Sequence, residues 1–163
     1  MKASIQANFF LMALIGALAA FAGPASGQSR PSGNMEILRE KIKADKKLAV
    51  AVHMGLTRAE EKSFWRIYNE YQRDLEKLNK RIGRLLRSYA KDYRNKTLTD
   101  AKARKLTDEF LSIEQAEAKL KGSYVPKLNV VLPAKKVARY LQIENKIRAL
   151  IRYDIAAEVP LVK

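Results

Sequence analysis

A line of six basic side chains in the middle of the chain is the feature with the clearest capacity to bind a partner. The six recur at intervals of three and four residues, and no acidic residue stands between the first and the fifth. On a helix this spacing places them on one face, along a line of about 25 Å. Like charges at these intervals repel one another by roughly a few tenths of a kcal/mol per pair, so a bound anion would stabilise the helix. We call this set the basic ridge: Lys77, Lys80, Arg84, Arg87, Lys91 and Arg94.

Two interpretations of the basic ridge remain open. It could contact acidic client proteins, phospholipid head groups or lipopolysaccharide, or it could be a solvated face of a basic protein. The 163 residues include 32 Lys plus Arg against 17 Asp plus Glu, and the formal net charge of +15 favours anionic partners. Nucleic acid would also fit a basic line, but the export signal described below argues against it.

Four aromatic residues precede the basic ridge on the same expected helix, namely Phe64, Trp65, Tyr68 and Tyr71. They could anchor a core, or they could line an apolar surface that holds unfolded clients. Basic charge beside exposed apolar surface would suit a general client-binding protein, because charge speeds encounter and apolar contact then holds the client.

A metal site has little support in this composition. The chain has no Cys, which excludes a thiolate site, and its one His leaves little room for a His-based cage. The weak candidates are His53, Met54 and Met35, whose imidazole and thioether groups would suit copper. The alternative for His53 is a place at a helix C-terminus, where a cation is stabilising. We expect no cofactor.

The sequence also gives no sign of an enzyme. Without Cys there is no thiol nucleophile, and a single His leaves little room for a catalytic triad. No phosphate-binding loop, nucleophile elbow or metalloprotease motif is present. The acidic residues that could be proposed as catalytic lie on segments rich in Lys and Arg, where ion pairing is the simpler role: Glu114, Glu117, Glu144, Asp154 and Glu158. Glu144, for example, has Arg148 four residues later.

The first 27 residues have the pattern of a secretory signal peptide. Lys2 provides a positive start, and Phe9 to Ala22 is an uncharged apolar run of 14 residues. As a helix this run would span about 21 Å, which is short for a hydrocarbon core of about 30 Å. Small residues then suit cleavage after Gly27, or alternatively after Ala22. The alternative is an uncleaved membrane anchor. We expect a periplasmic protein with no transmembrane segment after cleavage.

The remaining chain reads as helices throughout. Residues 28–34 form a flexible leader, and 35–163 form a single all-α domain. Helices are expected over 35–53, 58 to about 93, 100 to about 124, and from Pro133 to Pro160, with Pro126 kinking or ending the third. The second has a heptad seam: Phe64, Tyr68, Tyr71, Leu75, Leu78, Ile82, Leu85 and Tyr89. The expected fold is a long antiparallel helical hairpin with flanking N- and C-terminal helices, about four helices in all. Glu117 falls on the seam of the third helix and should pair with a base on a neighbour.

The second and third expected helices begin with similar sequences. They are Leu56-Thr57-Arg58-Ala59-Glu60 and Leu98-Thr99-Asp100-Ala101-Lys102. In each, the Thr is a natural N-cap. Glu60 can complete a capping box with Thr57, whereas Lys102 cannot accept a hydrogen bond and Thr99 must act alone.

The export signal, the basic all-helical chain and these two starts together resemble the Spy/CpxP periplasmic family. That family's motif is Leu-Thr-x-x-Gln, and here its last position is Glu60 in one copy and Lys102 in the other. The resemblance covers roughly residues 56–132. It implies a thin, curved helical dimer that binds unfolded clients or tunes an envelope stress sensor, and metal-responsive relatives bind zinc, nickel or copper.

The sequence therefore predicts an exported periplasmic helical binding protein, chaperone-like or envelope-stress-modulating, and a homodimer. Its partners would be unfolded or envelope proteins, or an anionic envelope surface. Two alternatives stay open. One is a metal-responsive periplasmic sensor or accessory protein, and the other is a structural adaptor for an envelope partner.

Overall fold

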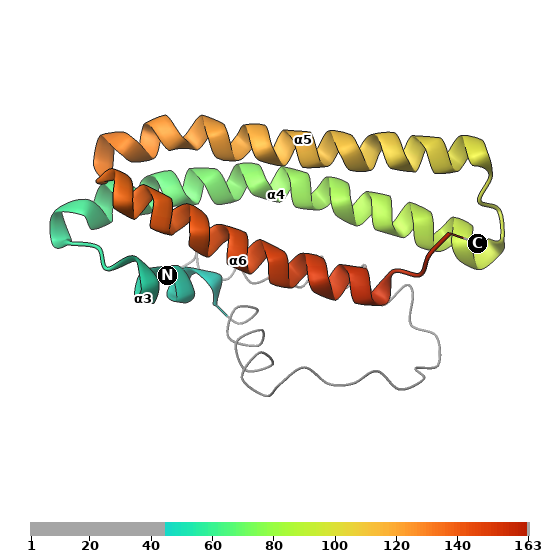
Figure 1. Cartoon of the computed structure of the whole chain (residues 1–163), viewed down its shortest axis with the longest axis horizontal. Coiled ribbons are helices and arrows are strands. Elements are labelled where there is room, and N and C mark those ends of the chain that lie inside the picture. The colour runs from blue at the N-terminus through green and yellow to red at the C-terminus, as the bar shows by residue number, and fades with distance from the viewer. Residues whose placement is uncertain (1–44, 163) are drawn as a thin grey trace.

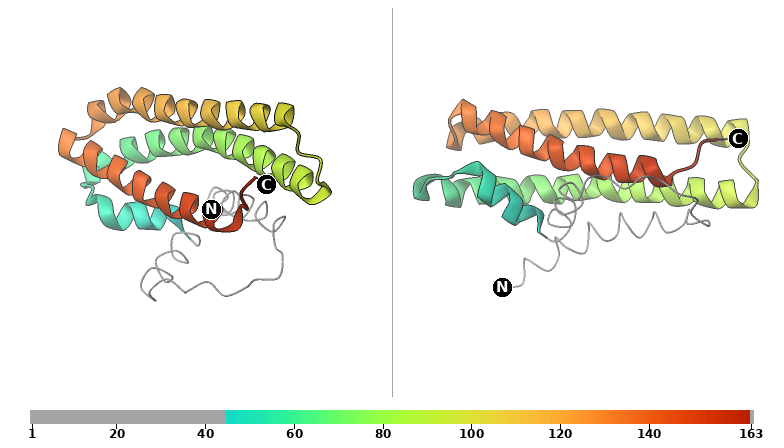
Figure 2. Two further views of the ribbon diagram at one scale, coloured as in Figure 1. Left: turned by 45° about the vertical axis from the view of Figure 1, so that its right-hand side comes forward. Right: turned by 60° about the horizontal axis from the view of Figure 1, so that its bottom comes forward.

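The computed structural model describes residues 45–162, and these form four helices with no strand among them. They are α3 (Lys46–Met54), α4 (Arg58–Asn95), α5 (Asp100–Val131) and α6 (Ala134–Glu158). The helices α4 and α5 form an antiparallel hairpin, and α6 lies alongside both (Figures 1 and 2). The predicted all-α hairpin is confirmed. The predicted signal peptide, the leader and residues 35–44 of the first predicted helix lie outside the described residues.

The helix ends follow from capping residues. The backbone amide of Thr57 donates to Glu60 Oε2 at 2.7 Å, and the two residues form the predicted capping box of α4. The hydroxyl of Thr99 accepts from the Lys102 amide at 3.3 Å, which caps α5 as predicted. Gly55 ends α3 in the left-handed region at φ 56°.

The core lies at the end of the bundle where α3 meets α6, and aromatic rings fill it. Phe64 is fully buried, and its ring meets that of Tyr140 edge to face with centroids 5.3 Å apart. Tyr71 meets Tyr124 at the same separation. The heptad seam of α4 is buried from Phe64 to Leu78 and again at Tyr89, whereas Ile82 and Leu85 are only half-buried. The seam prediction is therefore correct for the first half of α4 and too simple for the second.

The helix α5 runs past Pro126, although the sequence pattern ended it near Tyr124. It continues to Val131 because Tyr124 and Leu128 are both buried, one on each side of the proline in sequence. A proline inside a helix costs about 3 kcal/mol. Burying a large apolar side chain contributes about 1.5–3 kcal/mol, so the side chains beyond Pro126 can offset this cost.

Buried charges join the three long helices. Arg148 on α6 donates from Nε and one terminal nitrogen to Glu117 Oε2 on α5, at 3.0 and 2.8 Å. The other terminal nitrogen donates to Asn79 Oδ1 on α4 at 2.8 Å. This confirms the prediction that Glu117 pairs with a base on another helix. Glu144 does not pair with Arg148 four residues on, and instead accepts from Lys46 of α3 at 2.8 Å.

Two glycines offer a matched test of backbone energetics. An Ala at Gly122 on α5 would meet nothing within 4 Å, whereas Gly55 has φ +56°. We expect Gly122→Ala to raise the free energy of unfolding by about 1 kcal/mol through helix propensity. Gly55→Ala should lower it by about 1–2 kcal/mol through left-handed strain. Denaturant unfolding of the two variants checks this, and equal effects of the two would contradict the assigned backbone conformations.

The buried tyrosines predict unfolding at alkaline pH. Burial raises the pKa of Tyr124 to about 12, aided by its hydrogen bond to Asp74 Oδ2 at 2.7 Å. Burial also raises the pKa values of Tyr68, Tyr71 and Tyr140. In the unfolded chain tyrosine titrates near pH 10. The buried tyrosines of the folded state therefore stay protonated to higher pH than those of the unfolded chain. The free energy of unfolding that they contribute below pH 10 is lost as the pH rises toward their pKa values in the folded state.

We expect loss of helical circular dichroism above about pH 10, accompanied by a cooperative rise in phenolate absorbance. A gradual, non-cooperative titration of all tyrosines with helicity intact would contradict the buried assignment.

Candidate functional site

The part of the hairpin toward the end where α4 meets α5 carries a large positive charge. We call residues 81–105 the basic tip. This segment contains nine Lys and Arg residues and two acidic residues, a net charge of +7. All of its basic side chains are exposed except Arg81, which is half-buried. The two helices meet at this end through a turn over residues 96–99 (Figure 1).

The basic ridge lies on the outside of α4, and all six of its side chains are exposed. Its first two members are paired on their own helix, Lys77 with Asp74 at 2.7 Å and Lys80 with Glu76 at 2.8 Å. The other four, Arg84, Arg87, Lys91 and Arg94, make no ion pair with another described residue. The part of the ridge with uncompensated charge therefore coincides with the basic tip.

A small residue shapes one member of the ridge. The guanidinium of Arg87 lies over Gly83, with a terminal nitrogen 3.4 Å from the position that a Cβ would take there. Gly83 lies in the interior of α4 and is not in the left-handed region. Its missing side chain leaves space for this guanidinium.

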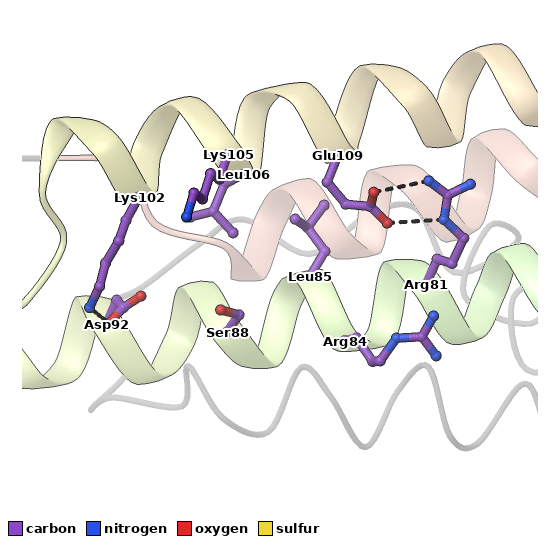
Figure 3. Close-up of a pocket in the computed structure, with 9 residues that line it drawn as sticks. All are labelled: Arg81, Arg84, Leu85, Ser88, Asp92, Lys102, Lys105, Leu106 and Glu109. Carbon is purple, nitrogen blue, oxygen red and sulfur yellow. Dashed lines mark hydrogen bonds and ion pairs between the residues drawn. The ribbon is translucent and has the colours of Figure 1, made fainter.

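A groove of about 350 Å³ lies between α4 and α5, lined by residues of the basic tip together with Leu106 and Glu109 (Figure 3). An ion pair lies toward each end of it. Arg81 and Glu109 form a two-bond pair at 3.0 and 2.9 Å, and Lys102 pairs with Asp92 at 2.6 Å. Leu85 and Leu106, one from each helix, are half-buried between these pairs. The complete lining is Arg81, Arg84, Leu85, Ser88, Asp92, Lys102, Lys105, Leu106 and Glu109.

Both carboxylates of the groove stay ionised at neutral pH. The hydrogen bond from Arg81 holds the pKa of Glu109 below its usual value, and the charges of Arg81 and Arg84 add to this. The hydrogen bonds from Lys102 and Thr97 do the same for the pKa of Asp92. The two carboxylates therefore remain paired with Arg81 and Lys102, and the lining of the groove keeps a net positive charge.

The predicted aromatic client surface is not formed. Phe64, Tyr68 and Tyr71 are 0%, 4% and 3% exposed, so they belong to the core and offer no surface to a client. Trp65 is half-buried, and the Lys47 ammonium lies 5.0 Å from the centroid of its ring. The exposed large apolar side chains nearest the basic tip along α5 are Phe110 and Leu111, at 50% and 49%.

Of the weak metal candidates, the two within the described residues lie in different surroundings. His53 is exposed in the last turn of α3, whereas the adjacent Met54 is fully buried in the core. Met35 lies outside the described residues. Among residues 45–162 no three His, Cys, Asp or Glu side chains are grouped closely enough to hold a metal ion.

The acidic residues considered for catalysis lie on α5 and α6. Glu117 and Glu144 make the buried contacts described above, and Glu114 pairs with Arg152 at 3.4 Å. Asp154 is half-buried, and Glu158 is exposed at the end of α6.

The residues that sequence reasoning missed are those that α5 brings to the groove, above all Lys105 and Glu109. Comparisons with family models, with curated proteins and with solved structures found no match for this chain. Within the described residues no helix combines the length and the apolar composition needed to cross a bilayer.

Proposed function

We propose that the protein is an exported, periplasmic binding protein that engages anionic partners through its basic tip. Its role would be chaperone-like or envelope-stress-modulating, and it would not be an enzyme. The observation that carries this proposal is the net charge of +7 over residues 81–105, on exposed side chains at one end of a helical hairpin. A homodimer is part of the proposal, because the family resemblance implies one.

The charge distribution supports binding rather than a purely structural role. Ion pairs elsewhere in the described residues offset many basic side chains, but Arg84, Arg87, Lys91 and Arg94 repel one another along α4. A bound anion would relieve this repulsion and would also be steered to the tip from solution. The core and the buried ion pairs lie mainly away from the tip, so binding there need not disturb them.

A client-binding role is favoured over a purely surface-binding role by Phe110 and Leu111. These side chains are half-exposed on α5, five and six residues beyond the basic tip. They replace the aromatic set of α4 as the apolar surface that could hold an unfolded client once charge has attracted it.

The test is light scattering by a chemically unfolded protein diluted with and without the purified, processed protein. An acidic client and a basic client are compared at low and high salt. We expect suppression of aggregation for the acidic client, weakening as salt rises. Absence of suppression for both clients, or equal suppression of both at all salt concentrations, would contradict a charge-directed role.

Phe110→Ser combined with Leu111→Ser separates the two roles. If the protein holds clients by apolar contact, this variant should no longer suppress their aggregation, and light scattering should rise to the level seen without the protein. Binding to an anionic surface without a client role would leave electrostatic binding unchanged and show no suppression in either protein.

A further inference from the structure

We propose that the groove between α4 and α5 binds an amphiphile with one acyl chain and a phosphate-containing head group. The inference deepens the proposed function and rests on it, because it names a ligand class for one part of the same basic tip.

The shape of the groove suits a linear apolar group. On α4 the lining runs from Arg81 to Asp92, a span of about 16 Å at the helical rise. Its volume of about 350 Å³ lies near the lower end of small-molecule sites. Leu85 and Leu106 face the space from opposite helices, and the aliphatic stems of neighbouring Lys and Arg side chains extend the apolar surface (Figure 3).

The charge of the groove selects an anionic head group. Its lining has four basic side chains and two acidic ones. Arg81 and Lys102 are engaged with the two carboxylates. Arg84 on α4 and Lys105 on α5 have no ion pair with another described residue. In Figure 3 Arg84 extends toward the Arg81 end of the groove and Lys105 toward the Lys102 end, so each is a cation that could meet a phosphate at its own end. Ser88 adds a hydroxyl that can donate a hydrogen bond.

A folded protein or a nucleic acid fits this space less well. The groove has Leu85 and Leu106 at its centre, whereas a polyanion would follow the exposed line of the basic ridge. The groove and the ridge share Arg84 but otherwise differ in their residues, so variants can separate them.

The test is calorimetric titration of the processed protein with a monoacyl phosphatidylglycerol below its micelle concentration. The comparison probes are the matching monoacyl phosphatidylcholine and inorganic phosphate. We expect the phosphatidylglycerol to bind at least about tenfold more tightly than either. Equal affinity for the phosphatidylcholine would show that the groove does not select an anionic head group. Equal affinity for inorganic phosphate would show that the acyl chain does not contribute to binding. Either result would overturn the inference.

Ser88→Trp tests the location. Ser88 is exposed and lies within the groove, so the indole would fill the space without changing charge. Affinity for the phosphatidylglycerol should fall at least about tenfold, while affinity for the polyanion heparin stays as in the wild type. Unchanged lipid affinity would overturn the inference. If Ser88→Trp fails to fold, Lys105→Gln should weaken lipid binding in the same direction.

Arg87→Gln combined with Lys91→Gln is the matched control. It removes two charges of the basic ridge that do not line the groove, and so should weaken heparin binding but leave lipid affinity within about twofold. Failure of the wild-type protein to bind heparin would count against the proposed function. Lipid binding that survives Ser88→Trp would count against the groove alone.

Discussion

Replacing Glu117 with Leu is expected to lower the free energy of unfolding by about 3–5 kcal/mol, because it leaves a buried charge without its partner. Glu117 is 3% exposed and Arg148 is 9% exposed. Arg152 and Lys121 also lie 3.4 and 3.6 Å from this carboxylate. Without it, three cations remain close together, and Arg148 keeps only its hydrogen bond to Asn79.

The control for this prediction is the pair Glu117→Leu with Arg148→Met, which replaces the buried ions by apolar groups. Such replacements are often close to neutral, so the double variant should recover most of the lost stability. Denaturant unfolding followed by circular dichroism measures the wild type, the two single variants Glu117→Leu and Arg148→Met, and the double variant. A double variant as unstable as the sum of its parts would show that the pair is not coupled.

Acid should weaken the same contact. Burial alone would raise the pKa of Glu117, but the hydrogen bonds and charge of Arg148, with Arg152 and Lys121, lower it below its usual value. Stability from this carboxylate is therefore present above the unfolded pKa and is lost as the pH falls through the folded one.

Charge reversal on the basic ridge is expected to abolish salt-sensitive binding to anionic partners. Arg84→Glu combined with Arg87→Glu changes the charge of the basic tip from +7 to +3, since each replacement alters it by two. Both side chains are exposed, so helicity and stability should stay close to those of the wild type. Affinity for heparin at low salt should fall by at least about tenfold.

The matched control is Lys62→Glu combined with Arg66→Glu. These two basic side chains are also exposed on α4, but at its other end, and the overall charge change is identical. Binding should persist in this variant. If both pairs weaken binding equally, net charge rather than the basic tip is responsible.

The spacing of apolar residues and the capping residues predicted the helices and where they begin. Thr57 with Glu60 and Thr99 are capping patterns that depend on a few neighbouring residues, and both were confirmed. The base partner of Glu117 could also be predicted, because an acid on a heptad seam must be neutralised wherever it is buried. The identity of that base depended on the register of α6, which the pattern does not give.

Features that depend on several helices could not be predicted in this way. Nothing local shows that Tyr124 and Leu128 are buried strongly enough to carry α5 through Pro126. The aromatic residues of α4 have the same spacing whether they face a core or a client. Their packing against Tyr140 of α6 and Tyr124 of α5 decides between these. The groove needs the register of α5 against α4, which places Glu109 opposite Arg81 and Lys102 opposite Asp92.

The most direct test of the proposed function is an NMR titration of the isotope-labelled, processed protein with an unfolded acidic protein. We predict that amide shifts change chiefly over residues 81–105 and that the changes disappear at high salt. Shifts centred on another surface, or shifts that persist at high salt, would contradict binding of anionic partners at the basic tip.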